Sequence, residues 1–156
     1  MSTPQDPAIE RFLVRVRAAQ PTLDLTHVKV RTFGGSKAMA DVIVPLIEQG
    51  EKTGTFALAW EFRNDPAAAP KLHDLYVVTD FEGVPVLLYR ITGIELVAFE
   101  DIGPQHVAVE GPNARDVKVW RDIHWPYWGG MLRAHGEEPS PRMPVIFQAF
   151  EVLFRR

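Results

Sequence analysis

Gly50-Glu51-Lys52-Thr53-Gly54-Thr55 is the stretch at which a predicted helix passes directly into a predicted strand. Upstream, Ser36 is a suitable N-cap, and apolar residues follow it at helical spacing: Met39, Val42, Ile43, Leu46 and Ile47. Downstream, residues 53–62 are rich in Thr, Phe, Leu and Trp, which favours a strand. Gly50 stands where a helix commonly ends in the left-handed conformation, which glycine adopts at little cost. The sequence therefore places one lysine and two threonine hydroxyls at a helix-to-strand junction.

Lys52 at this junction has two interpretations. A partly desolvated lysine has a lowered pKa and is a usable base, whereas a solvated lysine would only interact favourably with the helix C-terminus. Thr53 and Thr55 could likewise be chosen for β propensity, and in a strand their side chains would share one face. The stretch is not a phosphate-binding P-loop, because that motif needs a preceding strand, a following helix and a glycine directly before the lysine.

The composition limits the possible functions. A chain of 156 residues with 46% hydrophobic and 24% charged residues is typical of one globular domain. A net charge of −3 argues against a protein that coats nucleic acid non-specifically, since counterion release needs many clustered cations. The absence of cysteine excludes disulfides, thiolate catalysis and zinc–thiolate sites. Residues 1–7 lack the apolar core of a signal peptide, and no apolar run is long enough to span a membrane, which predicts a cytoplasmic protein.

The remaining patterns predict an α+β fold of four to six short strands with three helices. Asp6-Pro7 is a helix start, and the following apolar face consists of Ile9, Phe12, Leu13 and Val16. Further elements are predicted at 28–32 (strand), 75–79 and 84–91 (hairpin), 94–99 (strand), 114–125 (helix) and 145–154 (strand buried on both faces). Pro126 is expected to end or kink the last helix.

Several motifs, in their order along the chain, resemble the ASCH superfamily, whose members are PUA-like small β-barrels related to RNA-binding domains. They are Phe33-Gly34-Gly35-Ser36, Leu72-His73-Asp74-Leu75, Val77-Val78-Thr79-Asp80, Val109-Glu110-Gly111, Trp120-Arg121 with His124, and Met143-Pro144-Val145. The resemblance covers roughly residues 33–154 and is to the longer branch that contains tryptophan and histidine. It implies a PUA-like small β-barrel flanked by helices, as a single domain of residues 1–156 in which 1–32 form an N-terminal helical extension.

The resemblance also implies a site. In the acetylcytidine amidohydrolases of this superfamily, a lysine, the threonine three positions on and a later glutamate are catalytic, and Lys52, Thr55 and Glu110 match them. Neutral Lys52 would take the proton of the Thr55 hydroxyl, which would attack an acyl carbonyl, while Glu110 would orient the lysine or buffer its charge. One position departs from the family, because Ala57 stands where an arginine is usual. Arg63 and Arg90 are candidate replacements.

Aromatic residues recur every fourth position as Trp120, His124 and Trp128. One interpretation is an aromatic helix face packed on the barrel. The other is a ligand-binding surface, completed by Thr53, on which a ring stacks a base and His124 carries a proton or donates a hydrogen bond. The five histidines are scattered without ligand spacing, so neither a metal nor a cofactor is expected.

Together these patterns predict a cleft for RNA or a modified nucleoside, and hydrolysis of an acylated nucleobase or of RNA. The alternative is a non-catalytic RNA-binding module, or a regulatory module that recruits a protein partner. Ala57 favours binding without chemistry, whereas the presence of Lys52, Thr55 and Glu110 in one chain favours an enzyme. The net acidity favours a small ligand over long RNA, and neither a DNA nor a membrane partner is expected. The sequence predicts no oligomeric state.

Overall fold

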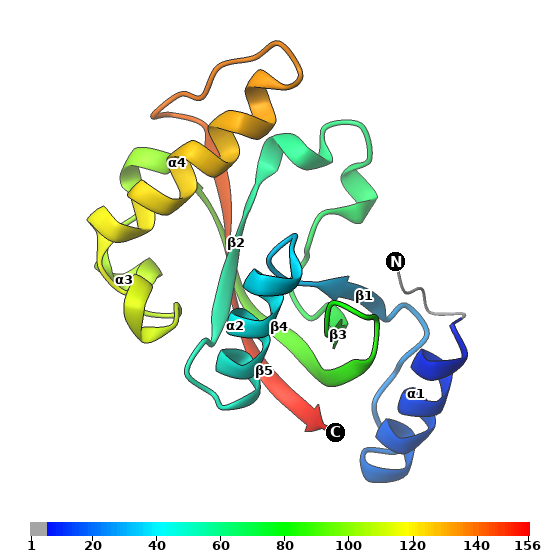
Figure 1. Ribbon diagram of the computed structural model, residues 1–156. Helices are drawn as coiled ribbons and strands as arrows, with labels where there is room; N and C mark the ends of the chain where they lie inside the picture. Colours follow the sequence, from blue (N-terminus) through cyan, green and yellow to red (C-terminus); the bar gives the residue numbers. More distant parts are fainter. Residues whose placement is uncertain (1–5) are drawn as a thin grey trace.

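Five strands form one sheet in the computed structural model, which describes residues 6–156 (Figure 1). The strands are β1 (Lys29–Thr32), β2 (Gly54–Leu58), β3 (Leu75–Thr79), β4 (Pro85–Ala98) and β5 (Pro144–Arg155). Their order across the sheet is β1-β3-β4-β5-β2, with β1 parallel to β3 and the other neighbours antiparallel. The sheet is strongly curled into a half-barrel, and β1 and β2 are its two edges.

Four helices flank this sheet: α1 (Pro7–Ala19), α2 (Lys37–Glu48), α3 (Pro104–Val107) and α4 (Val117–Arg133). Figure 1 shows α3 and α4 on one side of the molecule and α1 at the opposite end, beyond β1 and β3. Two predicted caps are confirmed, because the side chains of Asp6 and Ser36 accept the backbone N–H groups of Ala8 and Met39. The predicted α+β class is confirmed, and the barrel-like part of the fold is a half-barrel. None of the helices within residues 6–156 is long and apolar enough to cross a bilayer.

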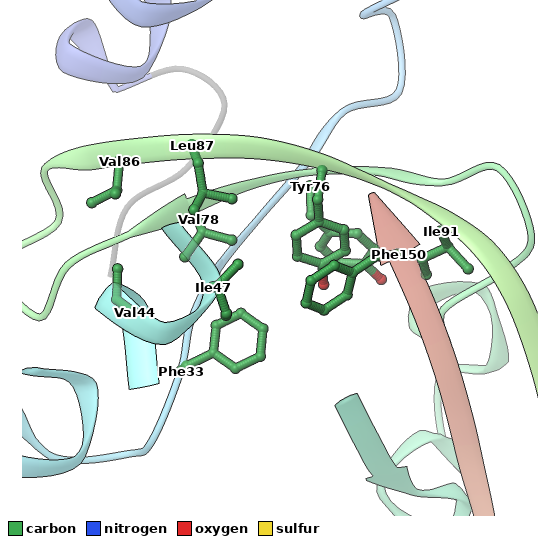
Figure 2. Packing of buried hydrophobic residues seen from close by; sticks show 10 residues of the cluster. Phe33, Val44, Ile47, Tyr76, Val78, Val86, Leu87, Ile91 and Phe150 are labelled. Atoms are coloured by element: carbon green, nitrogen blue, oxygen red, sulfur yellow. The ribbon is translucent and has the colours of Figure 1, made fainter. Parts of the chain in front are cut away.

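Three apolar clusters hold the helices on the sheet. The predicted face of α1 packs against Val77 and Leu88, α2 packs with Phe33 against the concave side, and α4 packs against the half of the sheet that contains β2. Figure 2 shows side chains of α2 pointing toward the sheet beside the rings of Tyr76 and Phe150. Full burial of one such side chain contributes about 1.5–3 kcal/mol. The division into a domain and an extension of residues 1–32 stays a prediction, and residues 1–5 lie outside the described part.

Several predicted boundaries are wrong. The strand after Gly50 begins at Gly54 and ends at Leu58, where a 3₁₀ turn follows. The two strands expected between 84 and 99 are one, since β4 continues through a register shift between Ile91 and Gly93 that lets a single strand bend. Likewise α4 does not end at Pro126 but continues to Arg133, because its last two turns bury apolar side chains that outweigh one missing donor. The alternative that Pro126 kinks the helix stays a prediction.

The buried faces of two elements also differ from expectation. In α2 the buried residues are Ala40, Val44 and Ile47, whereas Met39 and Val42 are largely exposed. The apolar spacing was compatible with more than one face, and the position of Phe33 and the concave sheet selects the one that is buried. In β5 burial is partial, since only Val145, Gln148 and Phe150 are buried.

Candidate functional site

Backbone hydrogen bonds fix the junction between α2 and β2. Gly50 adopts the predicted left-handed conformation, with φ of 81°. The N–H groups of Glu51 and Lys52 then both donate to the carbonyl of Leu46, at 2.9 and 3.0 Å. Thr53 donates to the carbonyl of Val109 at 2.8 Å, and its own carbonyl accepts the N–H of Phe150 at 2.9 Å. The segment that precedes Glu110 is therefore bound directly to the segment that carries Lys52.

Lys52 and Glu110 form a buried ion pair. Lys52 Nζ donates to Glu110 Oε1, and each residue is only 7% exposed. Arg115 holds the two backbones together, because its Nε donates to the carbonyl of Glu110 at 2.8 Å and its Nη2 to that of Glu51 at 2.7 Å. Burial lowers the pKa of Lys52, the charge of Glu110 opposes this, and the charge of Arg31 lowers it further. Lys52 therefore loses its proton at a lower pH than a lysine in water does.

Thr55 lies on β2, buried, opposite Gln148 of β5. Cross-strand partners project from the same side of a sheet, so the two side chains share one face. Gln148 Oε1 is also buried, without a hydrogen-bond partner. Within residues 6–156 the hydroxyl of Thr55 forms no hydrogen bond. Of the three predicted catalytic residues, the structure therefore joins Lys52 to Glu110 but does not join Thr55 to either of them.

The other threonine of the junction differs from Thr55. Thr53 precedes β2 and is exposed, whereas Thr55 is buried within the strand. The expectation that their side chains share one face was made for two residues of one strand, and Thr53 lies just before the first residue of β2.

The rings of Trp120 and Trp128 belong to the core. They are 0% and 2% exposed, their centroids lie 5.7 Å apart, and Trp120 also contacts Phe56 on β2 at 4.9 Å. The packing interpretation is confirmed, since neither ring presents a face on which a base could stack. Trp120 and Trp128 are therefore corrected from ligand-binding to structural residues, because the aromatic side of α4 is the side that faces the sheet.

His124 lies at the margin of this cluster, half-buried, and its ring stacks on Trp120 with centroids 4.3 Å apart. Its Nδ1 is 2.8 Å from the carbonyl of Trp120. A carbonyl only accepts, so Nδ1 carries the hydrogen and Nε2 of the neutral ring is an acceptor. Burial lowers the pKa of His124, and the charges of Glu110 and Lys52 act on it in opposite directions. His124 is thus within electrostatic range of the Lys52–Glu110 pair.

The lowered pKa of His124 predicts a loss of stability in mild acid. Below the ordinary value of 6.5 the unfolded chain binds a proton at this ring and the folded chain does not, so the free energy of unfolding falls as the pH drops through that range. Asparagine at this position keeps a donor for the carbonyl of Trp120 and removes the titration. We expect a flatter profile for His124→Asn in urea unfolding between pH 7.5 and 5. Parallel profiles for the two proteins would contradict this prediction.

Neither proposed replacement for the family arginine is free. The guanidinium of Arg63 lies 3.5 Å from the centroid of the Trp60 ring and donates to the Trp60 carbonyl at 2.9 Å. Arg90 is paired with Glu151 at 2.7 Å. The arginine that acts on Lys52 is Arg31 of β1, which sequence reasoning missed because one arginine in a four-residue strand gives no signal.

Two surface hollows lie away from these residues. One, of about 380 Å³, is lined by α1 and residues 25–28, and one, of about 270 Å³, by α2 and the β3–β4 turn. Neither is lined by Lys52, Thr55 or Glu110, so the expected cleft at these residues stays a prediction. No three His, Asp or Glu side chains in residues 6–156 are placed to hold a metal ion.

Comparison with known proteins matches this chain to one family model, that of the ASCH domain, over residues 29–154. A crystal structure of an ASCH domain from Lactobacillus crispatus JV V101 is similar, with 20% identity, a TM-score of 0.81, and coverage of 95% of this chain and 97% of the other. A protein from Enterococcus faecalis V583 has 22% identity, a TM-score of 0.83, and coverage of 96% and 94%. No curated protein matches the chain significantly. At these identities the two structures show a shared fold.

Proposed function

The chain belongs to the ASCH domain family, and from that premise we propose that it hydrolyses an acylated nucleobase with Lys52, Thr55 and Glu110. The observation that carries this proposal is the buried Lys52–Glu110 pair. A lysine whose pKa is lowered by burial, three positions before a buried threonine, supplies the base and the hydroxyl that nucleophilic catalysis needs.

The proposed reaction has two stages. Neutral Lys52 takes the proton from Thr55 Oγ1 as that oxygen attacks the acyl carbonyl carbon, and backbone N–H groups hold the oxyanion. The intermediate then breaks its bond to the exocyclic nitrogen of the base, which receives the proton from Lys52. Water next attacks the acyl-threonine ester, releasing the acid and restoring the hydroxyl. Glu110 stabilises the ammonium form of Lys52 between these steps, and His124 Nε2 is a candidate acceptor for the proton of the water.

Two observations favour a second candidate, a non-catalytic module that binds RNA or a regulatory partner. Ala57 removes the usual arginine, and the Thr55 hydroxyl forms no hydrogen bond with Lys52. Substrate binding would have to bring these two groups together, as often occurs when an enzyme forms its Michaelis complex.

The test is a screen of acylated nucleosides and short RNAs, with products identified by mass spectrometry. We expect Lys52→Met and Thr55→Val each to lower kcat/KM at least about a hundredfold, because each removes one partner of the proton transfer. Thr55→Ser keeps a nucleophile and should retain measurable activity. Lys118→Met is the matched control, since Lys118 is an exposed lysine on α4 and should leave kcat/KM unchanged.

Two outcomes would contradict the proposal. Near-normal hydrolysis by Lys52→Met or Thr55→Val would reject the base and nucleophile assignments. Binding of RNA or nucleoside without any hydrolysis would favour the non-catalytic module.

A further inference from the structure

Arg31 is an arginine without an acidic partner in the described part of the chain. It lies on β1, an edge of the sheet, opposite Val78. Its guanidinium carbon is 3.7 Å from the centroid of the Phe33 ring. Its Nε is buried and has no hydrogen-bond partner, and within residues 6–156 it forms no ion pair. Buried polar groups are nearly always satisfied, so free donors on a half-buried cation indicate that something else occupies them.

The nearest comparable cation does have a partner. Lys29 stands two positions earlier on the same strand and projects from the same face. Its Nζ is 2.8 Å from Asp74 Oδ2 and 3.2 Å from the carbonyl of Ala69. Asp74 therefore pairs with Lys29 and not with Arg31. Glu61 is close enough for the charge of Arg31 to act on its pKa, but within residues 6–156 it forms no ion pair with Arg31.

A phenol lies next to the side chain of Arg31. The hydroxyl of Tyr89 is buried, a hydrogen bond from Arg31 acts to lower its pKa, and its own hydrogen has no acceptor among the described residues. The ring of Tyr89 stacks on Tyr76 with centroids 5.2 Å apart. Burial raises the pKa of Tyr89 and that of Tyr76 each to about 12, against the opposing charge of Arg31. Both phenols are therefore protonated at neutral pH, and Tyr89 can donate a hydrogen bond to a ligand.

Arg31 also belongs to the same electrostatic environment as the catalytic lysine. Its charge lowers the pKa of Lys52, although Arg31 comes from β1 and Lys52 immediately precedes β2. These strands are the two edges of the curled sheet, so the half-barrel brings cations from both edges into range of each other. Any ligand that reaches Lys52 meets the field of Arg31 as well.

We propose that Arg31 binds a phosphate group of the ligand, so that the site takes a nucleotide or an RNA phosphodiester in preference to a free nucleoside. A guanidinium presents five N–H donors in a planar fork that fits phosphate, and the stack on Phe33 fixes its plane. An anion also offsets the buried charge, which a neutral carbonyl does not. Arg31 thus supplies from β1 the cation that Ala57 does not supply on β2. The choice of nucleobase in this inference rests on the proposed function, whereas the phosphate is inferred from Arg31 alone.

Isothermal titration calorimetry at one ionic strength tests the proposal with cytidine, cytidine 5′-monophosphate and the dinucleoside monophosphate of cytidine. We expect one of the two phosphate-containing probes to bind at least about tenfold more tightly than cytidine, since hydrogen bonds to a charged group are strong. A preference for the monophosphate identifies a terminal phosphate, and a preference for the dinucleoside monophosphate identifies a phosphodiester.

Variants assign this preference to one side chain. Arg31→Met keeps an apolar chain over Phe33 and should abolish the preference, while Arg31→Lys should keep part of it. Arg90→Met makes the same change in net charge at an exposed pair and should keep the full preference. Equal affinities of the wild-type protein for all three probes, no binding of either phosphate probe, or equal losses in Arg31→Met and Arg90→Met would each overturn the proposal.

The outcomes separate this inference from the proposed function. Binding requires no hydrolysis, so a phosphate preference that depends on Arg31 would stand even if no acylated substrate were cleaved. Hydrolysis of a free nucleoside with no phosphate preference would support the enzyme and reject Arg31. If Arg31→Met shows no cooperative unfolding and is therefore not folded, the affinities of the wild-type protein and of Arg31→Lys for the three probes still test the phosphate preference.

Discussion

Glu110→Ala is expected to lower the free energy of unfolding by about 3–5 kcal/mol at pH 7, because it leaves the buried ammonium of Lys52 without an acid. Burial already lowers the pKa of Lys52, and the variant removes the charge that opposes this. In the folded variant Lys52 therefore releases its proton at a pH where the unfolded chain still binds it, because the ordinary pKa of lysine is 10.5. Stability of the variant must then rise with pH up to that value, since the unfolded state binds more protons.

Urea unfolding at pH 7 and pH 10 measures both parts of this prediction. The deficit relative to the wild-type protein should be smaller at pH 10. Glu151→Ala is the matched control, because it breaks an exposed pair with Arg90 and should change stability by less than about 1 kcal/mol. The double variant Lys52→Met with Glu110→Leu should recover most of the loss, since two apolar side chains need no partner. A deficit for Glu110→Ala no larger than that of the control would show that the pair is solvated.

Local signals account for what the sequence predicted correctly. Asp6 and Ser36 cap helices through side-chain bonds to backbone groups two or three residues away, so these starts can be read from neighbouring residues. Gly50 is equally local, because the left-handed turn depends on that residue alone. The pairing of Lys52 with Glu110 spans 58 residues, and no periodicity indicates it. Only the order of family motifs brought the two residues into one hypothesis.

The errors have a common physical origin: the spacing of residues in a sequence does not indicate which other element packs against a given face of a helix or strand. Spacing of four places Trp120 and Trp128 on one side of a helix, whether that side meets solvent or the sheet. The sheet determines the outcome, and it buries them. Arg31 was missed for the converse reason, since its environment is created by curling of the sheet and not by its neighbours in sequence.

Gly54→Ala is expected to lower the free energy of unfolding by about 3 kcal/mol or more, because β2 and the Val109 segment leave no room for a methyl group. The new Cβ would overlap the carbonyl of Gln148 and lie 2.7 Å from Val109 Cγ2, and both obstacles are held by the sheet or by the bond from Thr53 to Val109. The strand must move away, which also separates Lys52 from the segment of Glu110. Thermal unfolding should show the loss, and the proposed hydrolysis should fall with it.

Gly93→Ala is the matched control for this change, because Gly54 and Gly93 lie opposite the same residue, Ala149, from its two neighbouring strands. A Cβ on Gly93 would meet Ala149 Cβ at 3.5 Å, which is an ordinary contact. This variant should unfold at the same temperature as the wild-type protein or slightly higher, since alanine loses less backbone entropy than glycine on folding. Equal effects of the two substitutions would mean that the sheet yields at Gly54. A large loss of stability in Gly54→Ala alone would instead show that a side chain cannot be accommodated at the junction that positions Lys52. Gly54 would then be needed both for the fold and for the geometry of the candidate site.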